Sequence, residues 1–95
     1  MVAPTLSDKR DEILRIAAAH GAGRIRVFGS MARGEEREDS DLDLLVEFQP
    51  GRSLLDHAAL ELDLQQLLGR PVQIGTPNGL REPWRERILA EAIPL

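Results

Sequence analysis

Short strand-like segments alternate with helical segments along this chain. The helical segments carry apolar residues at helical spacing, whereas the strand-like segments are short and partly alternate polar with apolar residues. This order predicts an α+β fold of two layers, in which a small mixed β-sheet is backed by helices. The predicted elements are a helix over 8–20, a strand over 24–28, one helical turn at 31–33, a strand over 41–48, a helix over 53–68, a strand over 72–75 and a helix over 83–92.

The size and composition of the chain limit the classes of protein to which it can belong. Its 95 residues predict one domain over 1–95, and the absence of cysteine excludes a disulfide framework, a thiolate zinc site and a thiol nucleophile. No apolar run approaches the roughly 20 residues that cross a bilayer. The N-terminal residues lack the apolar core of a signal peptide. We therefore expect a cytoplasmic protein that does not associate with membranes.

The charge distribution is uneven. The net charge is −4 and aromatic residues make up 3% of the chain, so we do not expect direct nucleic-acid binding. Residues 35–43 nevertheless hold six acids and one arginine. Such a run is typical of a solvated loop, or of a cation site if the acids are spaced to meet at one point.

The first half of a candidate site is the pair Gly29 and Ser30, directly after the strand predicted over 24–28. Glycine lets the backbone approach a ligand closely. The chain then turns toward a helix, so backbone N–H groups and the Ser30 hydroxyl can donate to a phosphate. Arg33 either supplies positive charge near the phosphates or fixes the loop.

The second half is Asp41-Leu42-Asp43 at the start of the next strand. In an extended segment, residues i and i+2 point to the same side, so both carboxylates face one point. Two like charges about 6 Å apart repel by roughly 3 kcal/mol at an effective dielectric of about 20. A magnesium ion would relieve this repulsion and keep positions for phosphate oxygens. The alternative is an acidic loop with two exposed aspartates. Glu47 shares the face but is expected at the surface.

These residues closely resemble the minimal nucleotidyltransferases of the DNA polymerase β-like superfamily. The motif reads Gly29-Ser30, ten residues, then Asp41-Leu42-Asp43, with Ala32-Arg33-Gly34 and Ser40 also as in the family. The resemblance continues through 43–48, 68–72 and 87–92, so it covers nearly the whole chain.

The resemblance implies that Asp41 and Asp43 bind Mg²⁺ and that Gly29 and Ser30 hold a nucleoside triphosphate, with ATP as the expected substrate. It also implies a partner, because such proteins are commonly antitoxins of HEPN-domain RNase toxins, and some transfer AMP to a tyrosine of the toxin. The family's third carboxylate corresponds to Gln73, which cannot act as a base.

Three functions follow as hypotheses. The first is an enzyme that transfers a nucleotidyl group to a protein hydroxyl, and the second is a catalytically weak antitoxin that acts by direct contact. Gln73 favours the second, whereas the intact pair Asp41 and Asp43 favours the first. A polymerase-like enzyme is a third hypothesis, against which the acidic composition counts. The sequence also leaves open whether the chain forms a homo-oligomer.

The helix predicted over 53–68 has two apolar sides. One alternative packs the second side against another helix of the same chain. The other leaves it exposed for a second subunit or a helical toxin, so that Leu64→Glu would abolish association without unfolding the domain. The first side holds Leu54, Leu55, Ala58, Ala59 and Leu62, and the second holds Leu60, Leu64, Leu67 and Leu68.

Overall fold

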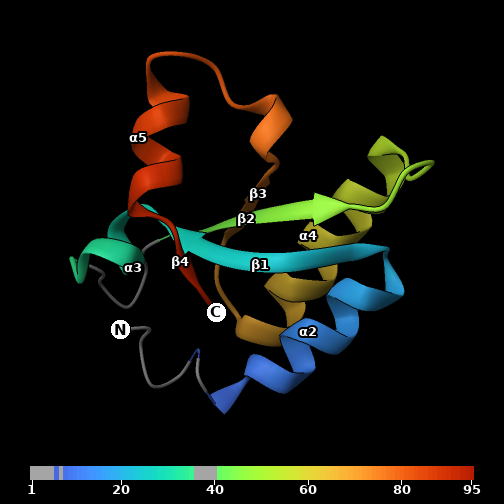
Figure 1. The fold of residues 1–95 in the computed structure, drawn as a ribbon. Helices are drawn as coiled ribbons and strands as arrows, with labels where there is room; N and C mark the ends of the chain where they lie inside the picture. Colours follow the sequence, from blue (N-terminus) through green and yellow to red (C-terminus); the bar gives the residue numbers. More distant parts are fainter. Residues whose placement is uncertain (1–5, 7, 36–40) are drawn as a thin grey trace.

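The computed structural model describes residue 6, residues 8–35 and residues 41–95. The elements follow the predicted order, with one strand added at the end. They are α2 (Arg10–Ala19), β1 (Ala22–Phe28), α3 (Ser30–Arg33), β2 (Leu42–Phe48), α4 (Leu54–Leu68), β3 (Val72–Gly75), the short 3-10 helix η1 (Pro77–Gly79), α5 (Trp84–Glu91) and β4 (Ile93–Pro94) (Figure 1). Residues 36–40 of the acidic loop predicted before Asp41, including Ser40, lie outside the described residues.

The four strands form one mixed sheet in the order β3-β2-β1-β4. β2 pairs with β1 antiparallel and with β3 parallel, and β4 pairs with β1 antiparallel. The predicted small mixed sheet backed by helices is therefore confirmed. The sequence did not predict β4, because a strand of two residues shows no periodicity.

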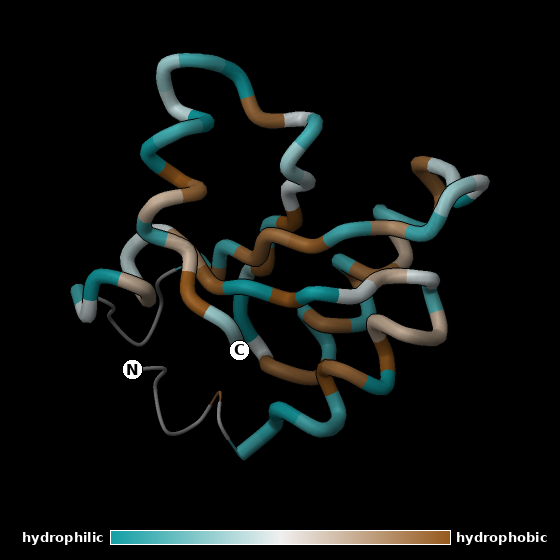
Figure 2. Tube along the Cα trace, in the orientation of Figure 1, coloured by the Kyte–Doolittle hydropathy of each residue, from teal (hydrophilic) through white to brown (hydrophobic). Residues whose placement is uncertain are grey.

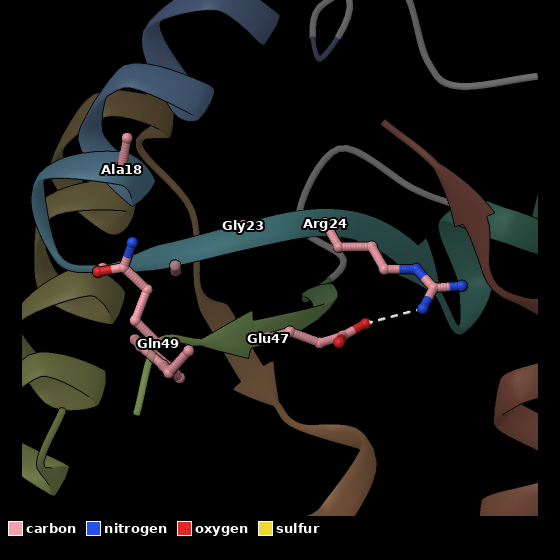
Figure 3. Close-up of a pocket in the computed structure, with 8 residues that line it drawn as sticks. Ala18, Gly23, Arg24, Glu47 and Gln49 are labelled. Atoms are coloured by element: carbon pink, nitrogen blue, oxygen red, sulfur yellow. Dashed lines mark hydrogen bonds and ion pairs between the residues drawn. The ribbon is translucent and has the colours of Figure 1, made fainter. Parts of the chain in front are cut away.

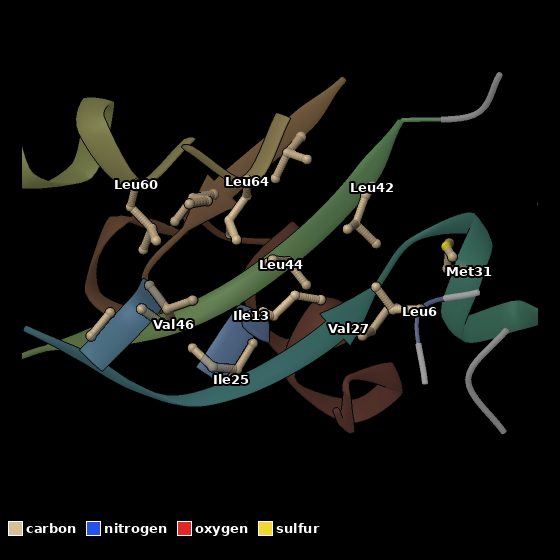
Figure 4. Close-up of a cluster of buried hydrophobic side chains, with 14 residues drawn as sticks. Leu6, Ile13, Ile25, Val27, Met31, Leu42, Leu44, Val46, Leu60 and Leu64 are labelled. Carbon is tan, nitrogen blue, oxygen red and sulfur yellow. The ribbon is translucent and has the colours of Figure 1, made fainter. Parts of the chain in front are cut away.

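The hydrophobic core lies between one face of the sheet and the helices α2 and α4 (Figures 1 and 4). β2 runs through the middle of the sheet and carries a continuous hydrophobic stretch (Figure 2). Its Leu42, Leu44 and Val46 face this core and are fully buried. The intervening residues Asp43 and Leu45 point to the other face, so β2 places an acid and a buried leucine on the face without the two helices.

The two ends of α4 match the sequence signals. The Ser53 side chain accepts a hydrogen bond from the Leu55 amide, and the Asp56 side chain accepts one from the Ser53 amide. This capping box fixes the start of the helix. At the other end, Gly69 adopts the left-handed conformation that ends helices, with φ 65°.

The structure buries the side of α4 that the sequence offered as a candidate partner interface. Leu60 and Leu64 are fully buried in the core. The alternative in which this side packs within the chain is therefore confirmed, and the alternative that leaves it exposed for a partner is wrong. The exposed side is the other one, where Leu54, Leu55 and Leu62 lie in solvent. The helix has to cover β3 and contact α2, and only one of its sides can do so.

Within the described part of the chain, no helix is both long enough and apolar enough to span a bilayer.

Candidate functional site

The Gly29–Ser30 corner lies where β1 ends and α3 begins. Gly29 has φ 73° and ψ −149°, a backbone conformation open essentially to glycine alone. Ser30 is the first residue of the short helix α3. The predicted turn after the strand is therefore present, and the chain changes direction here because Gly29 permits it.

Asp43 lies directly against this corner. β1 and β2 run antiparallel with Phe28 opposite Asp43, so the residue after Phe28 reaches the Asp43 carboxylate. A Cβ at Gly29 would collide with the Asp43 side chain. Glycine is therefore required twice, by the backbone angle and by the neighbouring carboxylate. The two halves of the sequence motif meet at this point.

Asp41 and Gln73 lie beside Asp43. Gln73 is opposite Asp43 in the parallel β2–β3 pair, so both side chains are on the same face of the sheet. The Gln73 side-chain amide donates a hydrogen bond to Oδ2 of Asp41 at 3.2 Å. The structure thus brings Gln73 next to both aspartates, at the end of the sheet where β2 begins.

The electrostatics of Asp43 show that this place disfavours added negative charge. Burial raises the pKa of Asp43, and repulsion from the Asp41 carboxylate raises it further. Arg33 lowers this pKa and Glu91 raises it. The ionised carboxylate is therefore held at a cost that a bound cation would relieve.

Arg33 is paired on two sides. Its Nε donates to Glu35 at 3.2 Å, and its Nη1 donates to the two oxygens of Glu91 at 3.1 and 3.3 Å. These two carboxylates, Glu35 first, raise the pKa of the guanidinium further above its ordinary value. Arg33 thus links α3 to the end of α5, and its contact with phosphates stays a prediction.

Glu91 is a site residue that the sequence did not reveal. It also accepts a hydrogen bond from the Gly29 backbone amide, at 3.0 Å from nitrogen to Oε1. The two residues are 62 positions apart in the chain. Glu91 comes close to Gly29 only because β4, which follows α5, pairs with β1. No spacing within the sequence could have shown this contact.

The donor set suits a magnesium ion that shares its coordination with a nucleotide. Among the described residues, no group of three or more potential metal-ligating side chains is gathered at one point. Two carboxylates, Asp41 and Asp43, are what Mg²⁺ uses when phosphate oxygens and water complete its shell. The raised pKa of Asp43 and the space that Gly29 leaves beside it fit such an ion.

A separate shallow hollow lies at the opposite end of the β1–β2 pair. Figure 3 shows Arg24 and Glu47 on its rim, with an ion pair of 3.1 Å between them. Glu47 is exposed and also contacts Arg26 at 3.7 Å, so it lies at the surface as predicted. This hollow does not share residues with the Gly29 corner.

Comparison with known proteins matches this arrangement to one family. A model of the nucleotidyltransferase domain matches residues 10–95. The chain is 41% identical over 88 residues to MJ0435 of Methanocaldococcus jannaschii, provisionally named a protein adenylyltransferase, and the match covers 93% of this chain and 95% of the relative. It is 38% identical over 91 residues to the protein adenylyltransferase MntA of Thermococcus cleftensis, with 87% and 92% covered.

Two solved structures are also similar. One, provisionally described as a minimal nucleotidyltransferase, has a TM-score of 0.87 and 58% identity and covers 100% of this chain and 97% of its own. The other, a toxin–antitoxin with AMP-PNP, has a TM-score of 0.75 and 16% identity over 88% of this chain and 69% of its own, and so shows the fold alone. By its sequence, its fold and the match over residues 10–95, the chain belongs to the nucleotidyltransferase domain family.

Proposed function

We propose that this protein is a magnesium-dependent nucleotidyltransferase that transfers AMP from ATP to a hydroxyl group of a partner protein. The observation that carries the proposal is the contact between the two motif halves, in which Asp43 lies against the Gly29 corner. A phosphate cradle and a metal-binding carboxylate have to be this close if one ion is to bridge protein and nucleotide. The name of the relative from Thermococcus cleftensis, a protein adenylyltransferase, supports the transferred group.

In this proposal the chain's own residues bind and orient the nucleotide. Gly29 and Ser30 position the triphosphate, and Asp41 and Asp43 hold the ion. The bound Mg²⁺ supplies neutralisation of the negative charge that develops on the phosphates. The acceptor oxygen bonds to the α-phosphorus, the bond from that phosphorus to the departing oxygen breaks, and pyrophosphate leaves with both electrons.

The proton of the attacking hydroxyl is the part of the reaction that this chain handles poorly. The amide of Gln73 stands beside Asp43, where a third carboxylate could accept a proton, and an amide is not a useful base. The proton therefore passes to water or to a group of the partner. We expect turnover of the isolated domain to be slow, while Mg–nucleotide binding is intact.

We further propose that the partner is a HEPN-domain RNase toxin and that the modified hydroxyl belongs to a tyrosine of that toxin. The family resemblance supports this partner, and the toxin–antitoxin with AMP-PNP shares the fold. The test is incubation with ATP labelled in the α-phosphate, Mg²⁺ and the product of the neighbouring gene, followed by mass spectrometry. An AMP adduct that is lost with EDTA and with Asp43→Asn supports transfer. An adduct that persists in both controls contradicts the proposed site.

A second candidate function is an antitoxin that acts by contact alone, and Gln73 is the observation that favours it. Here Asp43→Asn would still neutralise the toxin, although it carries no AMP adduct. Neutralisation that disappears together with the adduct supports the enzyme instead.

A further inference from the structure

The Glu91 carboxylate joins the last helix to the Gly29 corner by three polar contacts. Its Oε1 accepts from the Gly29 amide at 3.0 Å and from Nη1 of Arg33 at 3.1 Å, and its Oε2 lies 3.3 Å from the same Nη1. Only 22% of the side chain is exposed, whereas the Arg33 side chain is 44% exposed. Glu91 is thus the more enclosed partner, and the arginine is held against it.

The backbone fixes the place of Glu91. It is the last residue of α5, and Ile93 and Pro94 then pair with Val27 and Arg26 of β1. This pairing lies next to the end of β1, where Gly29 follows. The carboxylate is therefore delivered to the corner by two elements that contribute no residue to the sequence motif.

The contacts of Glu91 suit a residue that orients others. Both of its oxygens already face the guanidinium of Arg33, and one also faces the Gly29 amide. A second carboxylate, Glu35, holds Nε of the same guanidinium at 3.2 Å. The planar group of Arg33 is thereby fixed along two edges, which reduces the side-chain freedom that it would lose on meeting a ligand.

We propose that Glu91 is a positioning residue for the nucleotide, which holds the Arg33 guanidinium and the Gly29 backbone in the geometry that receives the phosphates. The inference rests on the proposed nucleotide-binding function of this corner. It adds a residue at the far end of the chain to the site, acting through Arg33 and Gly29 and not by touching the reacting atoms.

The sign of the effect separates positioning from charge. The described acids around the corner are Glu35, Asp41, Asp43 and Glu91. Glu35 and Glu91 bond the guanidinium of Arg33, and Asp43 interacts with it. If only charge mattered, removal of Glu91 would strengthen binding of an anionic nucleotide, because one negative charge is lost. Positioning predicts the opposite, since the donors that meet the phosphates lose their orientation.

The experiment measures binding of Mg–AMP-PNP by calorimetry to the whole protein and to three variants. Glu91→Ala removes every contact and should weaken binding about tenfold, the lower end of what outer-shell partners contribute at such sites. Glu91→Asp keeps the charge but shortens the side chain. Positioning predicts that it loses affinity, although less than Glu91→Ala, whereas an effect of charge alone predicts no loss. Glu91→Gln keeps an acceptor for Gly29 and should bind more tightly than Glu91→Ala.

Two controls accompany these variants: one tests whether Glu91 acts through Arg33, and the other tests whether any acid of α5 would have the same effect. With Arg33→Ala already present, adding Glu91→Ala should cause a smaller loss than it causes alone, because only the contact with the Gly29 amide then remains to be removed. Glu86→Ala changes an exposed acid of the same helix and should bind as the unchanged protein does. In ¹⁵N spectra without nucleotide, the Gly29 amide and the Arg33 Nε signals should shift in Glu91→Ala but not in Glu86→Ala.

The outcomes are distinguishable. If the unchanged protein does not bind Mg–AMP-PNP, the proposed function falls and the positioning role falls with it. If it binds, and Glu91→Ala and Glu91→Asp bind equally well or better, only the positioning role is overturned. Should Glu91→Ala fail to fold, Glu91→Asp carries the same decision, because it retains the charge and differs by one methylene.

Discussion

The side-chain amide of Gln73 donates a hydrogen bond to the Asp41 carboxylate at 3.2 Å, and Gln73 lies opposite Asp43 in the parallel strand pair. A neutral side chain thus occupies the place on β3 that is opposite Asp43, one of the two proposed metal ligands. It lowers the negative charge of the corner and supplies a donor where a base would accept.

Replacement of Gln73 by aspartate should therefore increase transfer. If the missing base limits the rate, Gln73→Asp should raise AMP transfer by about 10²–10⁴-fold, the usual range for general base catalysis. The measurement is the rate of adduct formation with labelled ATP. Gln73→Asn, which shortens the side chain without adding charge, is the control and should not gain activity. An unchanged rate in Gln73→Asp would mean that this position does not supply the base.

The raised pKa of Asp43 predicts how stability depends on pH. The folded protein binds the Asp43 proton more tightly than the unfolded chain does, so the free energy of unfolding falls as pH rises from the ordinary pKa of 3.8 through the raised folded value. Asp43→Asn lacks this titration. Without metal, it should be more stable than the unchanged protein at about pH 7 by up to about 1 kcal/mol, discounted because the carboxyl is only half-buried.

Urea denaturation in EDTA at about pH 7 and about pH 4 tests this prediction, because the difference between the two proteins should shrink at the lower pH. The same Asp43→Asn variant should lose Mg–nucleotide binding, so stability and binding change in opposite directions. If the two proteins have the same free energy of unfolding at both pH values, ionised Asp43 does not destabilise the fold.

Gly29 should tolerate no side chain. Gly29→Ala forces alanine into a conformation that costs about 1–3 kcal/mol, and the added methyl group collides with the Asp43 side chain. Gly34→Ala is a control at a second glycine with positive φ, because Gly34 has φ 72° with ψ 19°, the ordinary left-handed conformation, and open space around it. Thermal unfolding should show the larger loss for Gly29→Ala, and calorimetry should show lost Mg–nucleotide binding for that variant alone. Similar losses in both would argue against close contact with Asp43.

The two sides of α4 should respond differently to charge. Leu64→Glu places an unpaired carboxylate where the leucine is 1% exposed and should unfold the domain. Leu62→Glu on the same helix, where the leucine is 59% exposed, should leave the fold intact. Circular dichroism of both variants makes the comparison. A folded Leu64→Glu protein would contradict the core assigned to this helix.

The sequence predicted the α-helices and the three longer strands, and it singled out the motif residues, because both are encoded locally. The capping residues of α4 and the Gly29 turn show their conformational needs within a few positions. The sequence could not predict which side of α4 is buried, since both sides are apolar and only the placement of β3 and α2 decides. Glu91 was missed for a related reason: its partners Gly29 and Arg33 come from the other end of the chain.

The absence of any buried residue in α5 has a consequence for the motions of the molecule. A helix without buried side chains can detach at a free-energy cost below that of global unfolding, because little apolar surface is exposed when it leaves. Its backbone amides should therefore exchange with deuterated water well before those of α2 and α4, which contribute to the core. Such an opening would release Glu91 from the Gly29 corner while the sheet persists, so the proposed nucleotide site would open and close independently of the core.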